Sequence, residues 1–166
     1  MNRQNFLSNV DLAVRNVYKY DRDLLEVQAN ERALAHRLAV YIEPLFKGHS
    51  IDCEYNRYGT ELAPKSIPGI KICKQGKHPT DSIVPDILIH IRKSEDKDNL
   101  AAFEIKLNAP LSMCDHLKLK GLTLLNEKYK YEFGIGLEFY SDRCSRLLYV
   151  DGRPVAGSHL IQLEES

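Results

Sequence analysis

Hydrophobic and polar residues alternate along two stretches near the middle of the chain, residues 84–90 and 102–106. Because successive side chains of a β-strand point to opposite faces of a sheet, this alternation predicts two strands. The segment between them, residues 92–99, is rich in charge and contains no hydrophobic residue. Such a segment is typical of the loop of an antiparallel hairpin, so we expect the two strands to pair.

The expected hairpin gathers acidic and basic side chains on one face. By alternation, Glu104 and Lys106 project to the same side, whereas Phe103 and Ile105 point to the other side, which can be core. Pairing of the strands places Asp86 beside Glu104 and Lys106. Two carboxylates and an amine are a combination that binds a hard divalent cation and orients a water at a phosphodiester.

A long amphipathic helix is predicted over residues 24–46, because apolar residues recur there at helical spacing. The apolar stripe consists of Val27, Leu34, Leu38 and Tyr41 or Ile42. Glu31 falls on the same stripe, and an inward-facing carboxylate needs a cation, hydrogen bonds or a wet cleft. The alternative is that Glu31 lies at the edge of the stripe and forms a surface ion pair with Arg32 or Arg37.

The rest of the chain continues this mixture of helices and strands. The pattern predicts helices over residues 10–20 and 115–129, strands over residues 51–57 and 131–140, and a terminal hairpin over residues 147–155. Ser8 and Asp115 are the expected start signals of the two helices. We expect Lys118 and Lys120 to be solvated helix charges, with contact to phosphate as the alternative.

The segments Pro85-Asp86 and Glu104-Ile105-Lys106 resemble the two-part motif of the PD-(D/E)xK nuclease superfamily. Both halves fall on predicted neighbouring strands, a helix precedes them, and a helix and a strand follow. The resemblance covers about residues 22–140 and implies a restriction-endonuclease-like core of the α/β (α+β) class. In that core a central mixed four-stranded β-sheet is flanked by helices in the order αβββαβ, to which this chain adds a C-terminal β-hairpin.

The resemblance also implies a catalytic role for each residue of the motif. Asp86 and Glu104 bind Mg²⁺, for which Mn²⁺ can substitute, and the backbone carbonyl of Ile105 is another ligand. Lys106 contacts the attacking water or the scissile phosphate. In this superfamily an acid on the first core helix often faces the metal site, and Glu31 matches that position, so it is a further catalytic residue and candidate ligand. The number of metal ions stays open.

The length and composition set broad limits, since 166 residues with 43% hydrophobic content suffice for one compact domain. We expect a single nuclease-like domain over residues 1–166, with a core at about 22–140, a helical extension at 1–21 and a hairpin extension at 141–166. The sequence contains no long apolar run and starts with polar residues, so we expect a cytoplasmic protein without a membrane partner. Its 4 cysteines are widely separated and are expected to be reduced.

The overall charge does not mark a nucleic-acid-binding protein, because 23 basic residues balance 23 acidic residues. Basic residues nevertheless gather in segment 61–80, which carries Lys65, Lys71, Lys74 and Lys77 against Glu61 alone. This segment can follow a phosphate backbone. The alternative, to which we give equal weight, is a solvated loop whose lysines discourage edge-to-edge association.

The residues and the resemblance together predict a Mg²⁺-dependent endonuclease that hydrolyses phosphodiester bonds. DNA is the expected substrate because the superfamily most often acts on it. The alternative is a noncatalytic nucleic-acid-binding or assembly protein that retains the nuclease fold. A homodimer would let two sites cut two strands, but no coiled-coil seam specifies one. The choice between DNA and RNA, the strandedness and the sequence specificity of the substrate stay open.

Overall fold

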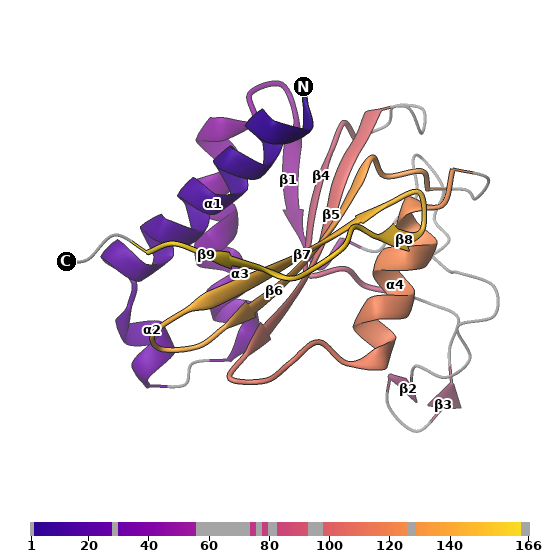
Figure 1. Cartoon of the computed structure of the whole chain (residues 1–166). Coiled ribbons are helices and arrows are strands. Elements are labelled where there is room, and N and C mark those ends of the chain that lie inside the picture. The colour runs from indigo at the N-terminus through magenta and orange to yellow at the C-terminus, as the bar shows by residue number, and fades with distance from the viewer. Residues whose placement is uncertain are drawn as a thin grey trace.

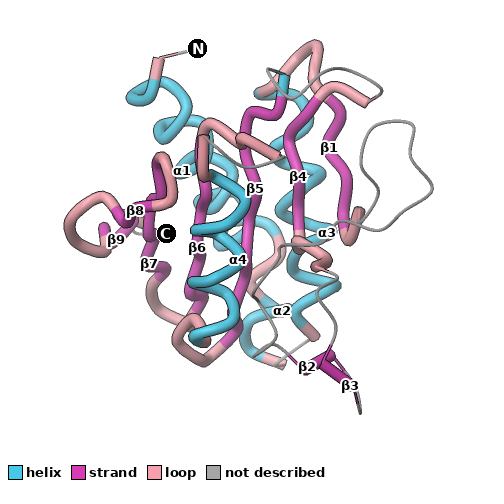
Figure 2. The backbone as a smooth tube through the Cα atoms, turned by 90° about the vertical axis from the view of Figure 1, so that its right-hand side faces the viewer, coloured by secondary structure: helices cyan, strands magenta, loops and turns pink. Residues whose placement is uncertain are grey.

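The computed structural model describes residues 2–27, 30–55, 74–75, 78–79, 83–92, 98–125 and 129–163, with backbone alone for 74–75 and 78–79. The fold is mixed α/β, and a seven-stranded mixed sheet separates helices on its two faces (Figure 1). Helices α1 (Arg3–Tyr20) and α3 (Glu31–Ile42) cover one face, and α4 (Met113–Thr123) lies over the other (Figure 2). The short helix α2 (Asp23–Glu26) precedes α3, and the 3-10 turn η1 (Glu43–Leu45) follows it.

The prediction of one continuous helix over residues 24–46 is wrong, because a new helix begins at Glu31. The side chain of Asn30 accepts a hydrogen bond from the Ala33 N–H at 2.8 Å and caps the new helix. Val27, expected on the apolar stripe, is 72% exposed. The buried side of α3 consists of Leu34, Ala35, Leu38, Ala39 and Ile42.

The two other main helices, by contrast, begin earlier than predicted. Helix α1 begins at Arg3 because the Asn2 side chain accepts the Asn5 N–H at 2.8 Å, so Ser8 is an interior residue and not a cap. Helix α4 begins at Met113, with Ser112 as its N-cap. Asp115 is therefore the third residue of the helix, where it completes a capping box with Ser112.

The strands of the sheet are β1 (Ser50–Cys53), β4 (Ile87–His90), β5 (Asn99–Leu107), β6 (Phe133–Phe139), β7 (Cys144–Val150), β8 (Arg153–Pro154) and β9 (His159–Ile161). They follow the order β1-β4-β5-β6-β7, and β8 and β9 both pair with β7. Strands β5 and β6 are parallel, and the other described pairs are antiparallel. A separate two-stranded ladder joins β2 (Lys74–Gln75) to β3 (His78–Pro79).

The sheet is mixed, as predicted, but it is larger than the four strands expected. Strand β7 runs antiparallel to β6 along its length, and a turn at Asp151 and Gly152 leads into β8. Both turn residues have positive φ, of 49° and 69°. The predicted terminal hairpin is thus part of the central sheet. Its first strand, β7, begins at Cys144, several residues before the predicted start.

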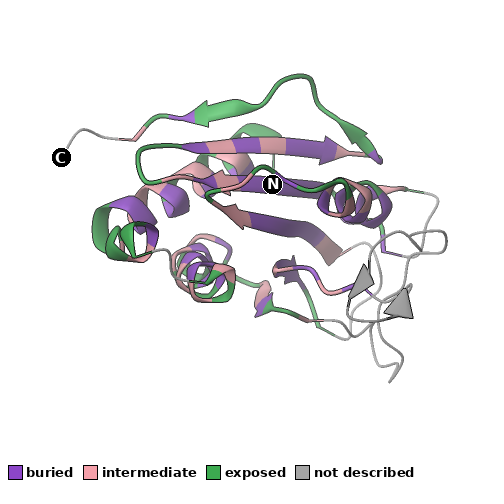
Figure 3. Cartoon of the chain, turned by 90° about the horizontal axis from the view of Figure 1, so that it is seen from below, coloured by how far each residue is buried: buried purple, intermediate pink, exposed green. Residues whose placement is uncertain are grey.

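The two faces of the sheet pack into separate hydrophobic clusters, and most of the central strands are buried between the helices (Figure 3). On the face toward α1 and α3, Phe103 and Ile105 belong to the larger cluster. On the opposite face, Leu88 and Ala102 pack in the cluster that contains Leu122 of α4. The predicted alternation of β4 and β5 is therefore correct, and it places acidic residues on the face that α4 shares.

The cysteines differ in state. Cys53 and Cys144 are free, whereas Cys114 is disulfide-bonded. The expectation of reduced cysteines is wrong for Cys114, because spacing along the chain does not show which cysteines the fold brings together. None of the helices in the described ranges is long and apolar enough to cross a lipid bilayer.

Candidate active site

The entry to β4 and the middle of β5 bring the two predicted carboxylates together. Ile87 lies opposite Phe103 in the antiparallel pair, and the Asp86 N–H donates to the Phe103 carbonyl at 3.0 Å. The carboxylate of Asp86 then reaches β5, where its Oδ2 accepts the Ile105 N–H at 2.6 Å. Asp86 is thus fixed beside the strand that carries Glu104.

Glu104 is the most deeply buried acidic residue of the described chain, with 1% of its surface exposed. Its Oε2 accepts a hydrogen bond from Lys118 Nζ on α4 at 2.8 Å. Its Oε1 is also buried and has no hydrogen-bond partner among the described residues. We call this Oε1 atom the open oxygen of Glu104.

Burial changes the protonation of both carboxyl groups. It raises the pKa of Glu104 well above its ordinary value, the negative charge of Asp86 adds to this, and the Lys118 ammonium offsets part of it. Burial likewise raises the pKa of Asp86 and outweighs the hydrogen bond from Ile105. Both acids therefore favour the neutral form more than exposed acids do, and a nearby divalent cation would restore their charge.

Lys106 lies at the end of β5 and is held by a carboxylate from α3. Its Nζ donates to Glu31 Oε2 at 3.0 Å, and the neighbouring Leu107 N–H donates to Glu31 Oε1 at 3.4 Å. Burial lowers the pKa of Lys106, but the hydrogen bond to Glu31 and the charges of Asp115, Glu31 and Asp86 outweigh it, so the pKa ends above its ordinary value. Lys106 is therefore an ammonium at neutral pH.

The two arginines that were the alternative partners of Glu31 form ion pairs with other acids. Arg32 contacts Glu54, with 2.6 Å between Nε and Oε1, and Arg37 contacts Asp21, with 3.0 Å between Nε and Oδ1. Glu31 instead faces the sheet. The start of α3 at Glu31 explains this, because the new helix directs its first residue toward the end of β5.

Two further charged residues of the site, Asp115 and Lys118, come from α4. Asp115 Oδ2 accepts hydrogen bonds from the N–H and the hydroxyl of Ser112, at 2.8 and 2.7 Å. The same carboxylate lies 3.7 Å from Lys106 Nζ and 3.7 Å from Lys118 Nζ. Asp115 therefore stands between the two lysines, one from β5 and one from its own helix.

The prediction that Lys118 is a solvated helix charge is wrong, because this residue is buried. Burial lowers the pKa of Lys118, but the charge of Glu104 and the hydrogen bond to it, with Asp115 and Asp86, outweigh this and raise the pKa overall. Lys120, by contrast, is exposed as predicted. The signal that distinguishes them is spacing, because Lys118 follows Asp115 by three positions and precedes the core residue Leu122 by four.

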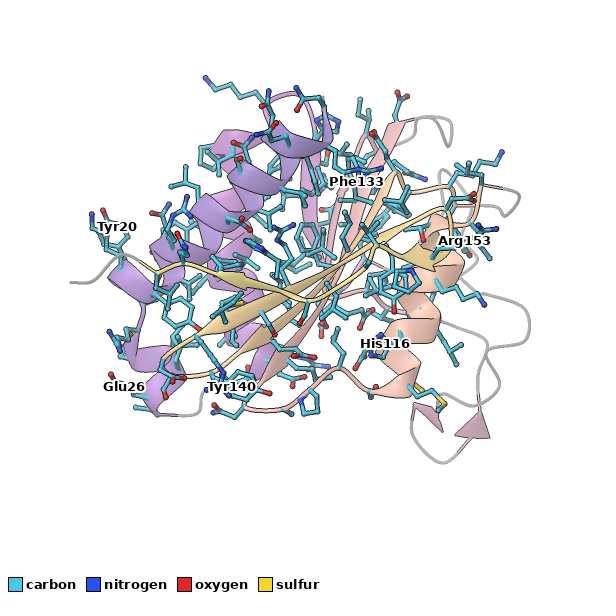
Figure 4. The ribbon with its side chains drawn as sticks, in the orientation of Figure 1. Tyr20, Glu26, His116, Phe133, Tyr140 and Arg153 are labelled. Atoms are coloured by element: carbon cyan, nitrogen blue, oxygen red, sulfur yellow. The ribbon has the colours of Figure 1, made fainter. Side chains whose placement is uncertain are left out.

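His116, the residue after Asp115 on α4, contacts the sheet at β7. Nδ1 of His116 lies 2.7 Å from the hydroxyl of Tyr149 on β7, and Figure 4 shows His116 on the helix beside the sheet. Contacts on both sides of α4 fix its rotation. This rotation places Asp115 beside Lys106 and Lys118 beside Glu104.

Six residues thus form one network, which we call the carboxylate site: Glu31, Asp86, Glu104, Lys106, Asp115 and Lys118. When all are ionised, its four carboxylates outnumber its two ammonium groups by two. A single divalent cation would balance this excess. No group of three or more His, Cys, Asp or Glu side chains arranged to hold a metal ion occurs in the described part of the chain, but Mg²⁺ is usually held by only one or two carboxylates with water and phosphate.

A further buried acid, outside the carboxylate site, lies on the same sheet face near the edge of the sheet. Asp52 of β1 accepts the Arg92 Nε–H at 2.8 Å through Oδ2, and the other guanidinium arm of Arg92 contacts Oδ1. Nε2 of His90 lies 2.8 Å from the same Oδ2. The Arg92 hydrogen bonds lower the pKa of Asp52, and the His90 contact adds to this against the effect of burial. We call these three residues the Asp52 cluster.

The predicted phosphate-contacting lysines cannot be placed relative to the carboxylate site. Lys65, Lys71 and Lys77 lie outside the described residues. Lys74 belongs to β2, of which the structure describes the backbone. Contact of these four lysines with nucleic acid therefore stays a prediction.

Comparison with known proteins adds no relative, because no family model, no curated protein and no solved structure matches the chain. Support for a function therefore comes from the carboxylate site itself.

Proposed function

We propose that this protein is a Mg²⁺-dependent endonuclease of the PD-(D/E)xK type and that it hydrolyses phosphodiester bonds in DNA. The observation that carries the proposal is the open oxygen of Glu104 together with a half-buried carboxylate, Asp86, whose charge adds to the raised pKa of Glu104. A buried carboxylate oxygen that lacks a hydrogen bond costs free energy. A divalent cation supplies the missing compensation, and hard cations prefer oxygen ligands.

The residues present fit such an ion. Asp86 and Glu104 would hold it through their carboxylates, the carbonyl of Ile105 would be another ligand, and Glu31 is a further candidate. When bound, Mg²⁺ neutralises phosphate charge and lowers the pKa of a bound water, which is the chemistry that hydrolysis of a phosphodiester requires. Mn²⁺ would take the same ligands.

Lys106 has a distinct role in this proposal. Its raised pKa keeps it protonated, so it cannot accept a proton from the attacking water at neutral pH. It can instead donate hydrogen bonds to an oxygen of the scissile phosphate and stabilise charge that develops there. Glu31 and Asp115 hold the ammonium in place from two sides, so its orientation is set before substrate binds.

The arrangement of the elements supports the same proposal. Helix α3, strands β1, β4 and β5, helix α4 and strand β6 follow one another in the order that the resemblance to the superfamily implies, with β2 and β3 inserted after β1. Asp86 immediately precedes β4, Glu104 lies on β5, and the Asp86 carboxylate accepts the Ile105 N–H next to Glu104. Order of elements alone does not determine a function, so the weight rests on the open oxygen and its surroundings.

The second candidate is a noncatalytic protein that binds nucleic acid or assembles with a partner while retaining this core. One observation favours it: ammonium groups already contact two of the candidate metal ligands, Lys118 at Glu104 and Lys106 at Glu31. Where lysines already balance the charge of the carboxylates, a metal ion adds less electrostatic stabilisation. Failure of the folded protein to bind Mg²⁺ or Mn²⁺, together with a stable complex with a partner, would favour this candidate.

Cleavage assays test the nuclease proposal directly. Supercoiled plasmid, linear duplex, single-stranded DNA, a branched junction and RNA are incubated with Mg²⁺, Mn²⁺ or EDTA. We expect metal-dependent cleavage of DNA that falls by about 100-fold or more in Asp86→Ala, Glu104→Ala and Lys106→Ala. Lys106→Met, which retains most of the chain length but removes the ammonium, should be as inactive as Lys106→Ala.

Lys120→Met provides the matched control, because it removes an exposed lysine from the same helix that contributes to the site. It should retain activity. Unchanged cleavage in all three alanine variants would refute the assigned site. Cleavage of RNA but not DNA would retain the chemistry and correct the substrate.

A further inference from the structure

Lys118 is an unusual component of a metal-binding site, because its ammonium contacts one of the expected ligands. The side chain is 11% exposed, and Nζ lies 2.8 Å from Oε2 of Glu104. Burying a lysine is costly unless a partner compensates it. Lys118 therefore compensates the charge of Glu104.

An ammonium and a divalent cation compete for the same carboxylate. Both are attracted to Glu104, and they repel each other across the few ångströms that separate the two oxygens of one carboxylate. A cation that reaches the open oxygen of Glu104 consequently weakens or breaks the hydrogen bond from Lys118 to Oε2.

Asp115 offers Lys118 a second position. Its Oδ2 is engaged by Ser112, and its Oδ1 faces Lys118 Nζ at 3.7 Å. That separation is too long for a good hydrogen bond, and a small rotation of the lysine side chain would close it. The exchange needs no movement of α4, whose first turn is fixed by the capping box.

We propose that Lys118 is an internal counter-ion of the metal-free site, which occupies Glu104 until a divalent cation displaces it onto Asp115. The inference rests on the proposed function, because it presumes that Glu104 is a metal ligand. It adds that the affinity of the site for metal is set by this exchange. Lys118 therefore weakens metal binding in the resting protein.

Titration calorimetry with Mn²⁺ and with Mg²⁺ on the full chain at pH 7.5 tests the exchange without relying on cleavage. We expect Lys118→Met to bind metal about tenfold more tightly than the wild type, because a repelling charge is removed. Lys120→Met should stay within about threefold of the wild type, since an exposed charge contributes little. Lys118→Arg, which retains the positive charge, should also lack the tenfold gain.

Folding is checked by circular dichroism, and Lys118→Gln replaces Lys118→Met if the latter unfolds, since the amide can still donate to Glu104. Tighter binding in either neutral variant, with wild-type behaviour of Lys120→Met, supports the inference. Metal binding by the wild type that is equal or weaker in the neutral variants overturns the inference and leaves the proposed function intact. Absence of metal binding in every variant overturns both.

Discussion

The carboxylate site and the Asp52 cluster each contain a buried acid on one face of the same sheet. They differ in how many oxygens of that acid accept hydrogen bonds. Both oxygens of Asp52 are engaged, by Arg92 and His90. Glu104 has one engaged oxygen and the open oxygen. Accordingly the pKa of Asp52 is lowered by its partners, and the pKa of Glu104 is raised by burial.

This contrast shows that burial of an acid does not identify a functional site. A buried acid whose oxygens are satisfied by fixed donors needs no ligand and stabilises the fold in its charged form. A buried acid with an open oxygen costs stability, and the chain retains that cost where a ligand removes it. We therefore assign a structural role to the Asp52 cluster, and the contrast supports the functional role proposed for the carboxylate site.

The positions of the clusters fit this division. Asp52 pairs with Leu88 across the β1–β4 ladder at the edge of the sheet, where Arg92 covers it from the loop after β4. Glu104 lies on β5 between β4 and β6, where Lys118 from the middle of α4 contacts it. The carboxylate site can receive side chains from α3, from the entry to β4, from β5 and from α4 at once, which a composite site requires.

The largest expected difference between the clusters concerns stabilisation by metal. At a Mg²⁺ concentration 100 times Kd, the free energy of unfolding should rise by about 2.7 kcal/mol in the wild type and in Asp52→Asn, because the ion binds the folded state. In Asp86→Asn and Glu104→Gln the rise should largely disappear. Urea unfolding with and without Mg²⁺ measures it.

Loss of the Mg²⁺ effect in Asp52→Asn as well would show that the two clusters form one site. An equal Mg²⁺ effect in Glu104→Gln and the wild type would place the metal elsewhere. NaCl serves as the control for general ionic effects when it is added at matched ionic strength.

The next expected effect concerns the metal-free protein. Asp52→Asn should lower the free energy of unfolding by about 2 kcal/mol, because it weakens hydrogen bonds between charged groups and leaves buried His90 with a poorer partner. Glu104→Gln should cost less than about 1 kcal/mol, since the folded protein already disfavours the charged form of Glu104. Urea unfolding at pH 7 in EDTA compares them, and a larger loss in Glu104→Gln would reverse the assignment of structural and functional clusters.

The sequence was sufficient for the part of the site that depends on local pattern. The period of two along residues 102–106 placed Glu104 and Lys106 on one face, and the charged loop predicted the pairing that brings Asp86 to them. Local alternation survives folding because a shift by one residue would bury the wrong face. The position of Glu31 was predicted from a helix with the wrong start. The helix in fact begins at Glu31, after the Asn30 cap.

The sequence was insufficient where the result depends on how elements dock. Lys118 and Lys120 lie two positions apart on one helix, and the rotation of α4 on the sheet buries the first and exposes the second. The same applies to β9, which is short and is defined by pairing with β7, and to the state of Cys114. Such long-range contacts leave a weak pattern in a single sequence.

The smallest expected effect is a difference in pH dependence. The pKa of Asp52 is lower in the folded state than its ordinary value, so its contribution to stability is present above the unfolded pKa and is lost as the pH falls through the folded pKa, below about pH 4. The pKa of Glu104 is higher in the folded state. Its charged form is disfavoured by folding, so stability is lost as the pH rises above its unfolded pKa of about 4.3.

Urea unfolding in EDTA between pH 3 and pH 8 separates the two contributions. We expect the free energy of unfolding of the wild type to fall between pH 5 and pH 7, and Glu104→Gln should reduce this decline, with the remainder due to Asp86, whose pKa is also raised. Asp52→Asn should leave the decline unchanged and flatten the loss at acid pH. If Glu104→Gln and the wild type declined equally, the open oxygen of Glu104 would carry no cost in the metal-free protein, and the physical argument for a metal at that oxygen would fail.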